Sequence, residues 1–177
     1  GLWLAALLAV MAGCFVRVWA RGDSLVPADL VHQLLIPFGS AVKIPEVKNH
    51  FAMDAAAIDY PWAVFWQATV RQGQLPLWNP LILGGQPAFA DSWTAVLSPF
   101  KLLLLFLPAE RAFSLGILLQ LLLAAAFMFV LLRELGRSDC AAFLGAIAYG
   151  LNSCFLMWYW RVPATFVWAP LVVLLAV

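Results

Sequence analysis

Long apolar runs alternate with short polar segments along this 177-residue chain, and four of the runs approach the length of a membrane-spanning helix. A helix needs about 20 mostly apolar residues to cross the hydrocarbon core of a bilayer. The predicted spans are residues 2–19, 112–132, 140–158 and 162–177, the last of them partial. Because the chain begins and ends inside apolar runs, we expect it to be the N-terminal fragment of one longer polytopic membrane domain.

The loops between these spans predict an orientation. The short loop at 133–139 carries two arginines, and short arginine-bearing loops mark the cytoplasmic side of a membrane. Residues 20–111 would then form a long external loop. Arg17 and Arg21, at the end of the first span, oppose this orientation.

Residues 97–107 are also apolar, but they are too short to form another span. Pro99, Lys101 and Pro108 confine the uninterrupted apolar run to residues 102–107, which is far less than the thickness of a bilayer core. We expect this segment to lie in the membrane interface.

Small residues recur in the third predicted span. Ala142, Ala146 and Gly150 follow one another at four-residue intervals, so they share one face of a helix. Small side chains on one face let helix backbones approach closely. The pattern predicts helix packing rather than a functional site.

Composition agrees with a membrane protein and excludes several other classes. Of all residues, 65% are hydrophobic and 11% are charged, whereas soluble domains carry about 25% charged residues. The net charge is +1 without any basic cluster, so nucleic-acid binding is not expected. The three cysteines show no CxxC spacing, and we expect them to be small buried apolar side chains rather than disulfides or zinc ligands.

Within the loop, residues 53–73 predict an amphipathic helix that starts or is interrupted near Pro61 and ends at Gly73. Asp54 and Asp59 bracket its beginning, and on one continuous α-helix residues five apart lie well separated around the axis. From residue chemistry alone, the favoured interpretation of each acid is a cap or a first-turn acid that complements the helix dipole. A functional carboxylate is the alternative.

Residues 75–99 predict an ordered, turn-rich loop at the membrane surface, because they contain four prolines and the pair Gly84-Gly85. In this loop Trp78 and Asn79 either contact substrate or serve as an interfacial anchor and a turn, and the two interpretations are even. Arg71, next to the loop, is the cation best placed to meet a lipid phosphate.

Several of these motifs together resemble the first external loop of the YfhO-type bacterial membrane proteins. The motifs are Asp54 followed by Pro61-Trp62, then Gly73-x-Leu-Pro-Leu-Trp-Asn-Pro, Gly84-Gly85-x-Pro87, Ala90 and Ser98-Pro99. Residues 131–136 and 141–146 are similar to that family's second span, short turn and third span. The likeness covers about residues 25–177, and Leu-Pro-Leu-Trp-Asn-Pro is its most specific part.

The resemblance implies an all-α polytopic membrane protein with GT-C-like transmembrane helices and a long external first loop carrying short amphipathic helices. It implies a glycosyltransferase of the bacterial cell membrane that moves a sugar from a polyprenyl-phosphate donor to an extracytoplasmic acceptor such as a cell-envelope glycopolymer. The implied partners are therefore a lipid-linked sugar donor and membrane lipids.

For the site, the resemblance implies Asp54 as general base or as a carboxylate that helps to hold a divalent metal, the one cofactor it suggests. The glutamine common between the family's Asp and Pro is not evident here, and Asp59 is an additional acid, so it remains open which acid acts. Arg71, Trp78 and Asn79 would bind substrate. The competing function is a non-catalytic carrier or envelope assembly protein, although the spans carry almost none of the charge that a carrier needs.

Overall fold

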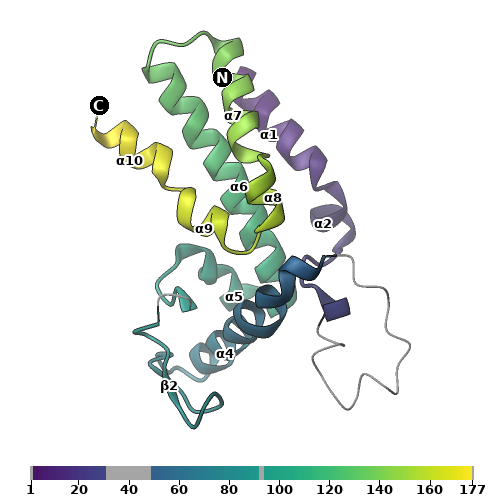
Figure 1. The fold of residues 1–177 in the computed structure, drawn as a ribbon, viewed down its shortest axis with the longest axis vertical. Coiled ribbons are helices and arrows are strands. Elements are labelled where there is room, and N and C mark those ends of the chain that lie inside the picture. Colours follow the sequence, from purple (N-terminus) through teal and green to yellow (C-terminus); the bar gives the residue numbers. More distant parts are fainter. Residues whose placement is uncertain (1, 31–48, 92–93, 177) are drawn as a thin grey trace. The chain divides into compact units, whose positions relative to one another are not determined.

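A computed structural model describes residues 2–30, 49–91 and 94–176 of the chain (Figure 1). The chain divides into two compact units, each considered by itself. One unit comprises Gly1–Asp23 with Ile117–Val177, and the other comprises Ser24–Gly116. Residues 31–48 of the predicted external loop lie outside the described residues.

The first unit consists of helices joined by short turns in its described residues. Its elements are α1 (Leu2–Cys14), α2 (Val16–Arg21), the part of α6 (Ala109–Glu134) from Ile117 onward, α7 (Asp139–Gly150), α8 (Ser153–Met157), α9 (Val162–Phe166) and α10 (Ala169–Ala176). Helix α1 packs on α7, where the rings of Trp3 and Phe143 meet edge to face with their centroids 5.6 Å apart.

The small residues of α7 pack as the sequence predicts. Ala142, Ala146 and Gly150 are all buried. A methyl group added at Gly150 would lie 2.8 Å from the Cβ of Ala125 on α6 and 3.1 Å from the Cε of Met11 on α1. The glycine therefore sits where three helices approach too closely for any side chain.

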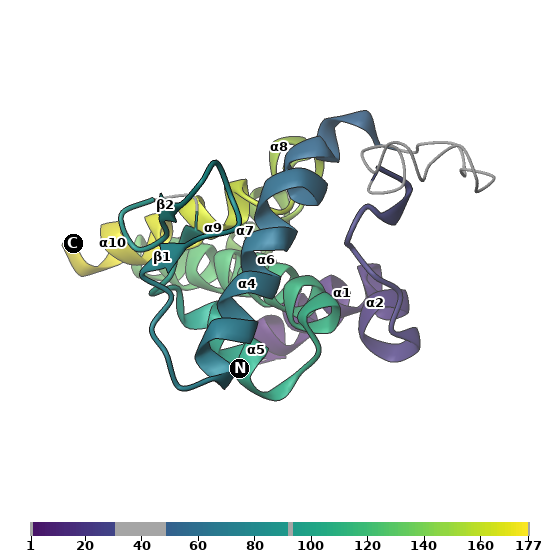
Figure 2. The ribbon, with the colours of Figure 1, turned by 90° about the horizontal axis from the view of Figure 1, so that it is seen from below.

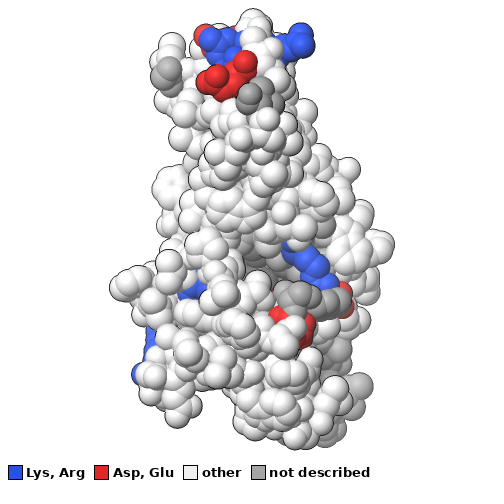
Figure 3. Space-filling view, turned by 90° about the vertical axis from the view of Figure 1, so that its left-hand side faces the viewer, with Lys and Arg blue, Asp and Glu red and all other residues white. Residues whose placement is uncertain are grey.

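A tight turn joins α6 to α7. Gly136, at φ +74°, ends α6 in a Schellman motif, in which the amides of Arg137 and Gly136 donate to the carbonyls of Leu132 and Arg133. The Nε of Arg133 lies 2.8 Å from a carboxylate oxygen of Asp139, which opens α7. Figure 3 shows charged side chains gathered at this end of the helices, next to a surface that carries none.

Two helical stretches in the described residues are long and apolar enough to cross a membrane. They are Ala109–Glu134, with 26 residues, and Asp139–Met157, with 19 residues; an 18-residue stretch in each has a mean hydropathy of 2.7 and 1.6, respectively. The other apolar helices, Leu2–Cys14 and Pro163–Ala176, are shorter.

The predicted fold class, an all-α polytopic GT-C-like membrane protein, is therefore wrong. The first apolar run is divided at Phe15, which lies between α1 and α2 and has a non-helical ψ of 22°. The last apolar run is divided between α9 and α10. Apolar composition alone could not reveal these interruptions, because backbone breaks rather than hydropathy shorten the helices. The prediction for the cysteines is also wrong, since Cys14, Cys140 and Cys154 are exposed.

The second unit combines short helices with a small β-hairpin. Its elements are the 3₁₀ turn η2 (His50–Ala52), the π-helix η3 (Ala55–Asp59), α4 (Tyr60–Arg71), β1 (Trp78–Asn79), β2 (Gln86–Pro87), the 3₁₀ turn η5 (Pro99–Leu102), α5 (Leu103–Phe106) and the first turns of α6. Figure 2 shows the hairpin running beside α4.

Helix α4 confirms the amphipathic helix predicted from the sequence. It begins next to Pro61 and ends at Arg71, with Gly73 in the left-handed region at φ +73°. Its Ala63 and Trp66 pack with Leu104 and Ala112 into the core of the unit. Apolar residues at this helical spacing explain why one face of α4 is buried.

Side chains of α4 also fix the segment that follows the hairpin. The amide of Gln67 donates to the carbonyls of Leu104 and Leu107 at 2.6 and 2.7 Å, and the indole of Trp66 donates to Val96 at 3.2 Å. Gln67 thereby satisfies carbonyls that the end of α5 leaves open. Residues 99–106 form only one short 3₁₀ turn and one helical turn, which confirms that residues 97–107 do not span a membrane.

Candidate functional site

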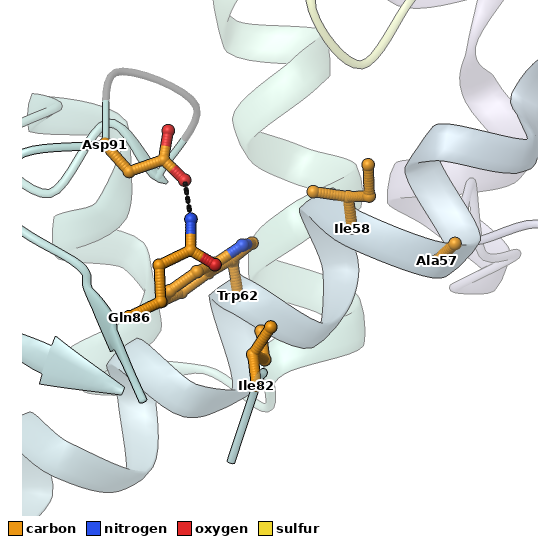
Figure 4. Close-up of a pocket in the computed structure, with 6 residues that line it drawn as sticks. All are labelled: Ala57, Ile58, Trp62, Ile82, Gln86 and Asp91. Carbon is orange, nitrogen blue, oxygen red and sulfur yellow. Dashed lines mark hydrogen bonds between the residues drawn. The ribbon is translucent and has the colours of Figure 1, made fainter. Parts of the chain in front are cut away.

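An open hollow of about 430 Å³ lies in the second unit, between the helical segment and the hairpin. It is lined by Ala57, Ile58, Trp62, Ile82, Gln86 and Asp91 (Figure 4). Figure 4 shows the amide of Gln86 between the indole of Trp62 and the carboxylate of Asp91. The Nε2 of Gln86 donates to Oδ2 of Asp91 at 3.2 Å.

One wall of this hollow is formed where the chain changes from a π-helix to the α-helix α4. Residues Ala55–Asp59 form a π-helix, closed by the amide of Tyr60 donating to the carbonyl of Ala55. Pro61 follows directly; it has no N–H to donate, and in an α-helix its ring would press on the carbonyl four residues back. The wider π-turn accommodates the proline, and π-turns inside helices are frequent at functional sites. It sets how Ala57 and Ile58 lie relative to Trp62.

The hairpin provides the opposite wall. Its strands pair Trp78 with Pro87 and Asn79 with Gln86. Asn79 is buried, and its side-chain oxygen accepts the amide of Leu81 at 2.9 Å, which turns the chain toward Ile82. The register of the hairpin places Gln86 at the hollow, whereas the predicted substrate-binding residues Trp78 and Asn79 do not line it.

A buried threonine holds the loop that carries Asp91. The hydroxyl of Thr94 donates to the carbonyls of Ala88 and Asp91, at 2.6 and 2.8 Å, and its amide donates to Asp91 at 3.1 Å. The amide of Ala88 in turn donates to Leu77 of the hairpin at 2.8 Å. Thr94 is 2% exposed, so these bonds are shielded from water.

Lys101 supports this threonine from the other side. Its ammonium donates to the carbonyl of Thr94. Burial lowers the pKa of Lys101 from 10.5 to about 8, and the nearby Asp59 carboxylate opposes that shift. Buried Thr94 and the half-buried Lys101 and Asp59 thus form a polar cluster that supports the loop of Asp91.

Asp54 and Asp59 do not line the hollow. Both have α-helical backbone angles inside a continuous helical stretch, and neither makes a side-chain capping hydrogen bond. Neither acid therefore caps a helix through its side chain, and the interpretation as acids that complement the helix dipole stays a prediction. The carboxylate of Asp59 interacts electrostatically with the ammonium of Lys101. Asp54 is half-buried and directly precedes the π-helix.

The three predicted substrate-binding residues are separated. Arg71 is exposed at the end of α4, and Asn79 is buried in its turn. Trp78 is 56% exposed, and Gly85 lies against its indole: a methyl group added at this glycine would come within 2.8 Å of Cε2. Of the five predicted site residues, none lines the hollow.

The residues that line the hollow were missed from the sequence for identifiable reasons. Trp62 belongs to a quoted motif, and Gln86 occupies the variable position of Gly84-Gly85-x-Pro87, but neither residue was assigned a chemical role. Asp91 follows no motif spacing, and only the tertiary fold brings it within reach of Gln86. Two signals were present in the sequence: an acid inside a turn-rich loop, and a proline in a helix after two acids.

The hollow is suited to a polyhydroxylated ligand. An amide offers a donor and an acceptor, and a carboxylate accepts hydroxyl protons, whereas the indole of Trp62 is only 4% exposed and serves as buried wall. A single carboxylate among the lining residues does not fit a divalent metal, and the described residues hold no group of three or more His, Cys, Asp or Glu that could bind one.

Comparisons of the chain with protein-family models, with curated proteins and with solved structures each find no match. They identify no family, and the resemblance to the YfhO-type proteins stays a prediction. The features of the chain that bear on its function are therefore the hollow and the two helices of membrane-spanning length.

Proposed function

We propose that the protein is a multi-pass membrane protein that transfers a sugar from a polyprenyl-phosphate donor to an acceptor hydroxyl at the membrane surface. The observation that carries this proposal is the hollow in which Trp62, Gln86 and Asp91 converge. In this proposal, helix α6 and residues 139–157 cross the membrane and anchor the protein that carries the hollow.

In the proposed step the sugar lies in the hollow, and Gln86 orients the carboxylate of Asp91. The acceptor oxygen forms a bond to the anomeric carbon, while the bond from that carbon to the phosphate oxygen breaks. Polyprenyl phosphate leaves with the electron pair, and Asp91 takes the proton of the acceptor hydroxyl. A positioned base of this kind contributes about 10² to 10⁴ in rate.

The test is Asp91→Asn in full-length protein reconstituted in membranes that supply the acceptor. Synthetic polyprenyl-phosphate hexoses serve as donors, and release of polyprenyl phosphate is measured. We expect the rate to fall by about 10² to 10⁴ with unchanged membrane insertion. Glu110→Gln is the matched control, because Glu110 is an exposed acid outside the hollow.

Full release by the Asp91→Asn protein would contradict the proposed role of this carboxylate. A carrier or assembly protein would instead bind the labelled donor without releasing polyprenyl phosphate. Wild-type protein that binds without release would therefore favour the non-catalytic alternative.

A further inference from the structure

In the short helical segment from Pro99 to Phe106, the charged side chain points inward and several apolar side chains point outward, the opposite of what a segment in water shows. Its one charged residue, Lys101, is turned toward the interior, where it donates to Thr94. Its outer side chains are Leu102, Leu105 and Phe106, which are 56%, 38% and 82% exposed. In contact with water, the stable arrangement would place the ammonium outside and these apolar groups inside.

The orientation of this segment is fixed by its inner face. Phe100 and Leu104 are buried, and Leu104 packs in the core with Ala63 and Trp66 of α4. Gln67 binds the carbonyls of Leu104 and Leu107. The segment therefore cannot turn its apolar outer face inward without breaking these contacts.

A helix that is apolar on all sides is normally buried in a protein or in lipid. Here one side is buried in protein, and the chain itself indicates what covers the other. Only Leu107 and Pro108 separate Phe106 from α6, a 26-residue helix that contains an 18-residue stretch of mean hydropathy 2.7. The segment thus leads, over a short connection, into a helix that is long and apolar enough to cross a membrane.

We propose that the outer face of residues 99–106, formed by Leu102, Leu105 and Phe106, lies in the interface of a lipid bilayer. Exposed Arg111, in the first turn of α6, is then at the level of the lipid phosphates. Three side chains are too few for a stable contact with a second copy, which needs about 800 Å² from each partner. This inference does not depend on the proposed sugar transfer.

Spin labels test the inference in full-length protein reconstituted into phosphatidylcholine vesicles, with Cys14, Cys140 and Cys154 replaced by alanine. Single labels are placed at Leu102→Cys and Phe106→Cys, with Gln74→Cys as the matched exposed control. The labels at 102 and 106 are expected to be accessible to oxygen and shielded from a water-soluble nickel chelate, and the label at 74 the reverse. Equal access of the chelate to all three would overturn the inference, as would dipolar coupling between labels at 106 on two copies.

A second measurement uses the unaltered protein and so does not depend on how a labelled variant folds. Vesicles containing a photoreactive phosphatidylcholine with the reactive group in its acyl chain are irradiated, and the modified peptides are mapped by mass spectrometry. Adducts are expected on residues 102–106 as well as on α6. Adducts on α6 with none on residues 102–106 would overturn the inference.

Discussion

Gly85 shows how a single residue holds the wall of the hollow in place. Its φ of +123° is accessible to glycine and rare for other residues. A methyl group at this position would also lie 2.8 Å from the Nε1 of Trp78. Neighbouring Gly84 also has a positive φ, +76°, but a methyl group there would meet nothing within 4 Å. Substituting each glycine in turn therefore distinguishes the cost of backbone strain, which both positions share, from the cost of steric conflict, which arises only at Gly85.

We predict that Gly85→Ala destabilises the hairpin by roughly 1 to 3 kcal/mol, because backbone strain is joined by displacement of the exposed Trp78 ring. Gly84→Ala should cost only about 1 kcal/mol, from backbone strain alone. Hydrogen exchange at the amide of Ala88, which donates to Leu77 across the base of the hairpin, measures both changes. Equal exchange rates in the two variants would contradict the close contact with Trp78.

The second prediction concerns Lys101 and pH. Its pKa is about 8 in the folded protein, against 10.5 as the ordinary value. Between these values the unfolded chain binds more protons than the folded one, so the free energy of unfolding rises with pH. The gain across this window is about 3 kcal/mol, since each pKa unit corresponds to about 1.4 kcal/mol.

Urea unfolding of detergent-solubilised protein, measured from pH 7.5 to 9.5 in wild type and Lys101→Met, checks this prediction. The variant lacks the titrating amine, so only wild type should gain stability over this range. Tyr60 is present in both proteins, and burial followed by Glu110 raises its pKa above 10. A parallel pH dependence of the two proteins would show that Lys101 does not carry the effect.

At the scale of elements, the sequence predicted what local patterns determine. The long helix α6 follows from the length of its apolar run, and the ends of α4 follow from Pro61 and Gly73. The hollow could not be predicted in this way, because Trp62, Gln86 and Asp91 come from three separate elements. Their approach depends on the hairpin register and on the hydrogen bonds of Thr94, neither of which leaves a periodic pattern.

The π-helix gives an element-scale prediction. In Pro61→Ala the restored N–H can donate to the carbonyl of Ala57, so the segment 55–59 should convert to α-helix. The conversion rotates Ala57 and Ile58 relative to Trp62 and should weaken donor binding without loss of stability. Hydrogen exchange of the amides of 55–62 should slow, while Val64→Ala, an exposed substitution in α4, leaves both properties unchanged. Unchanged exchange in Pro61→Ala would contradict the role assigned to the proline.

At the scale of the whole molecule, the distribution of charge constrains how the chain meets a membrane. The described residues of the first unit carry their charges in three places: between Arg17 and Asp23, between Arg133 and Asp139, and at Arg161. Residues 117–132 and 140–160 carry none. A helix that crosses a bilayer needs such an uncharged stretch with polar residues at its ends, and both helices of membrane-spanning length meet this condition.

The last prediction is the orientation of α6. The turn 133–139 carries two arginines in a short connection, so it should lie on the cytoplasmic side, and the hairpin unit that precedes α6 should lie outside. In protein without its native cysteines, Ser138→Cys should react with a membrane-impermeant thiol reagent only after the cytoplasmic face is opened. Gln74→Cys should react in intact cells. Reaction of both from one side would show that α6 does not cross the membrane, and the reverse pattern would show that Arg17 and Arg21 outweigh the short turn in setting the orientation.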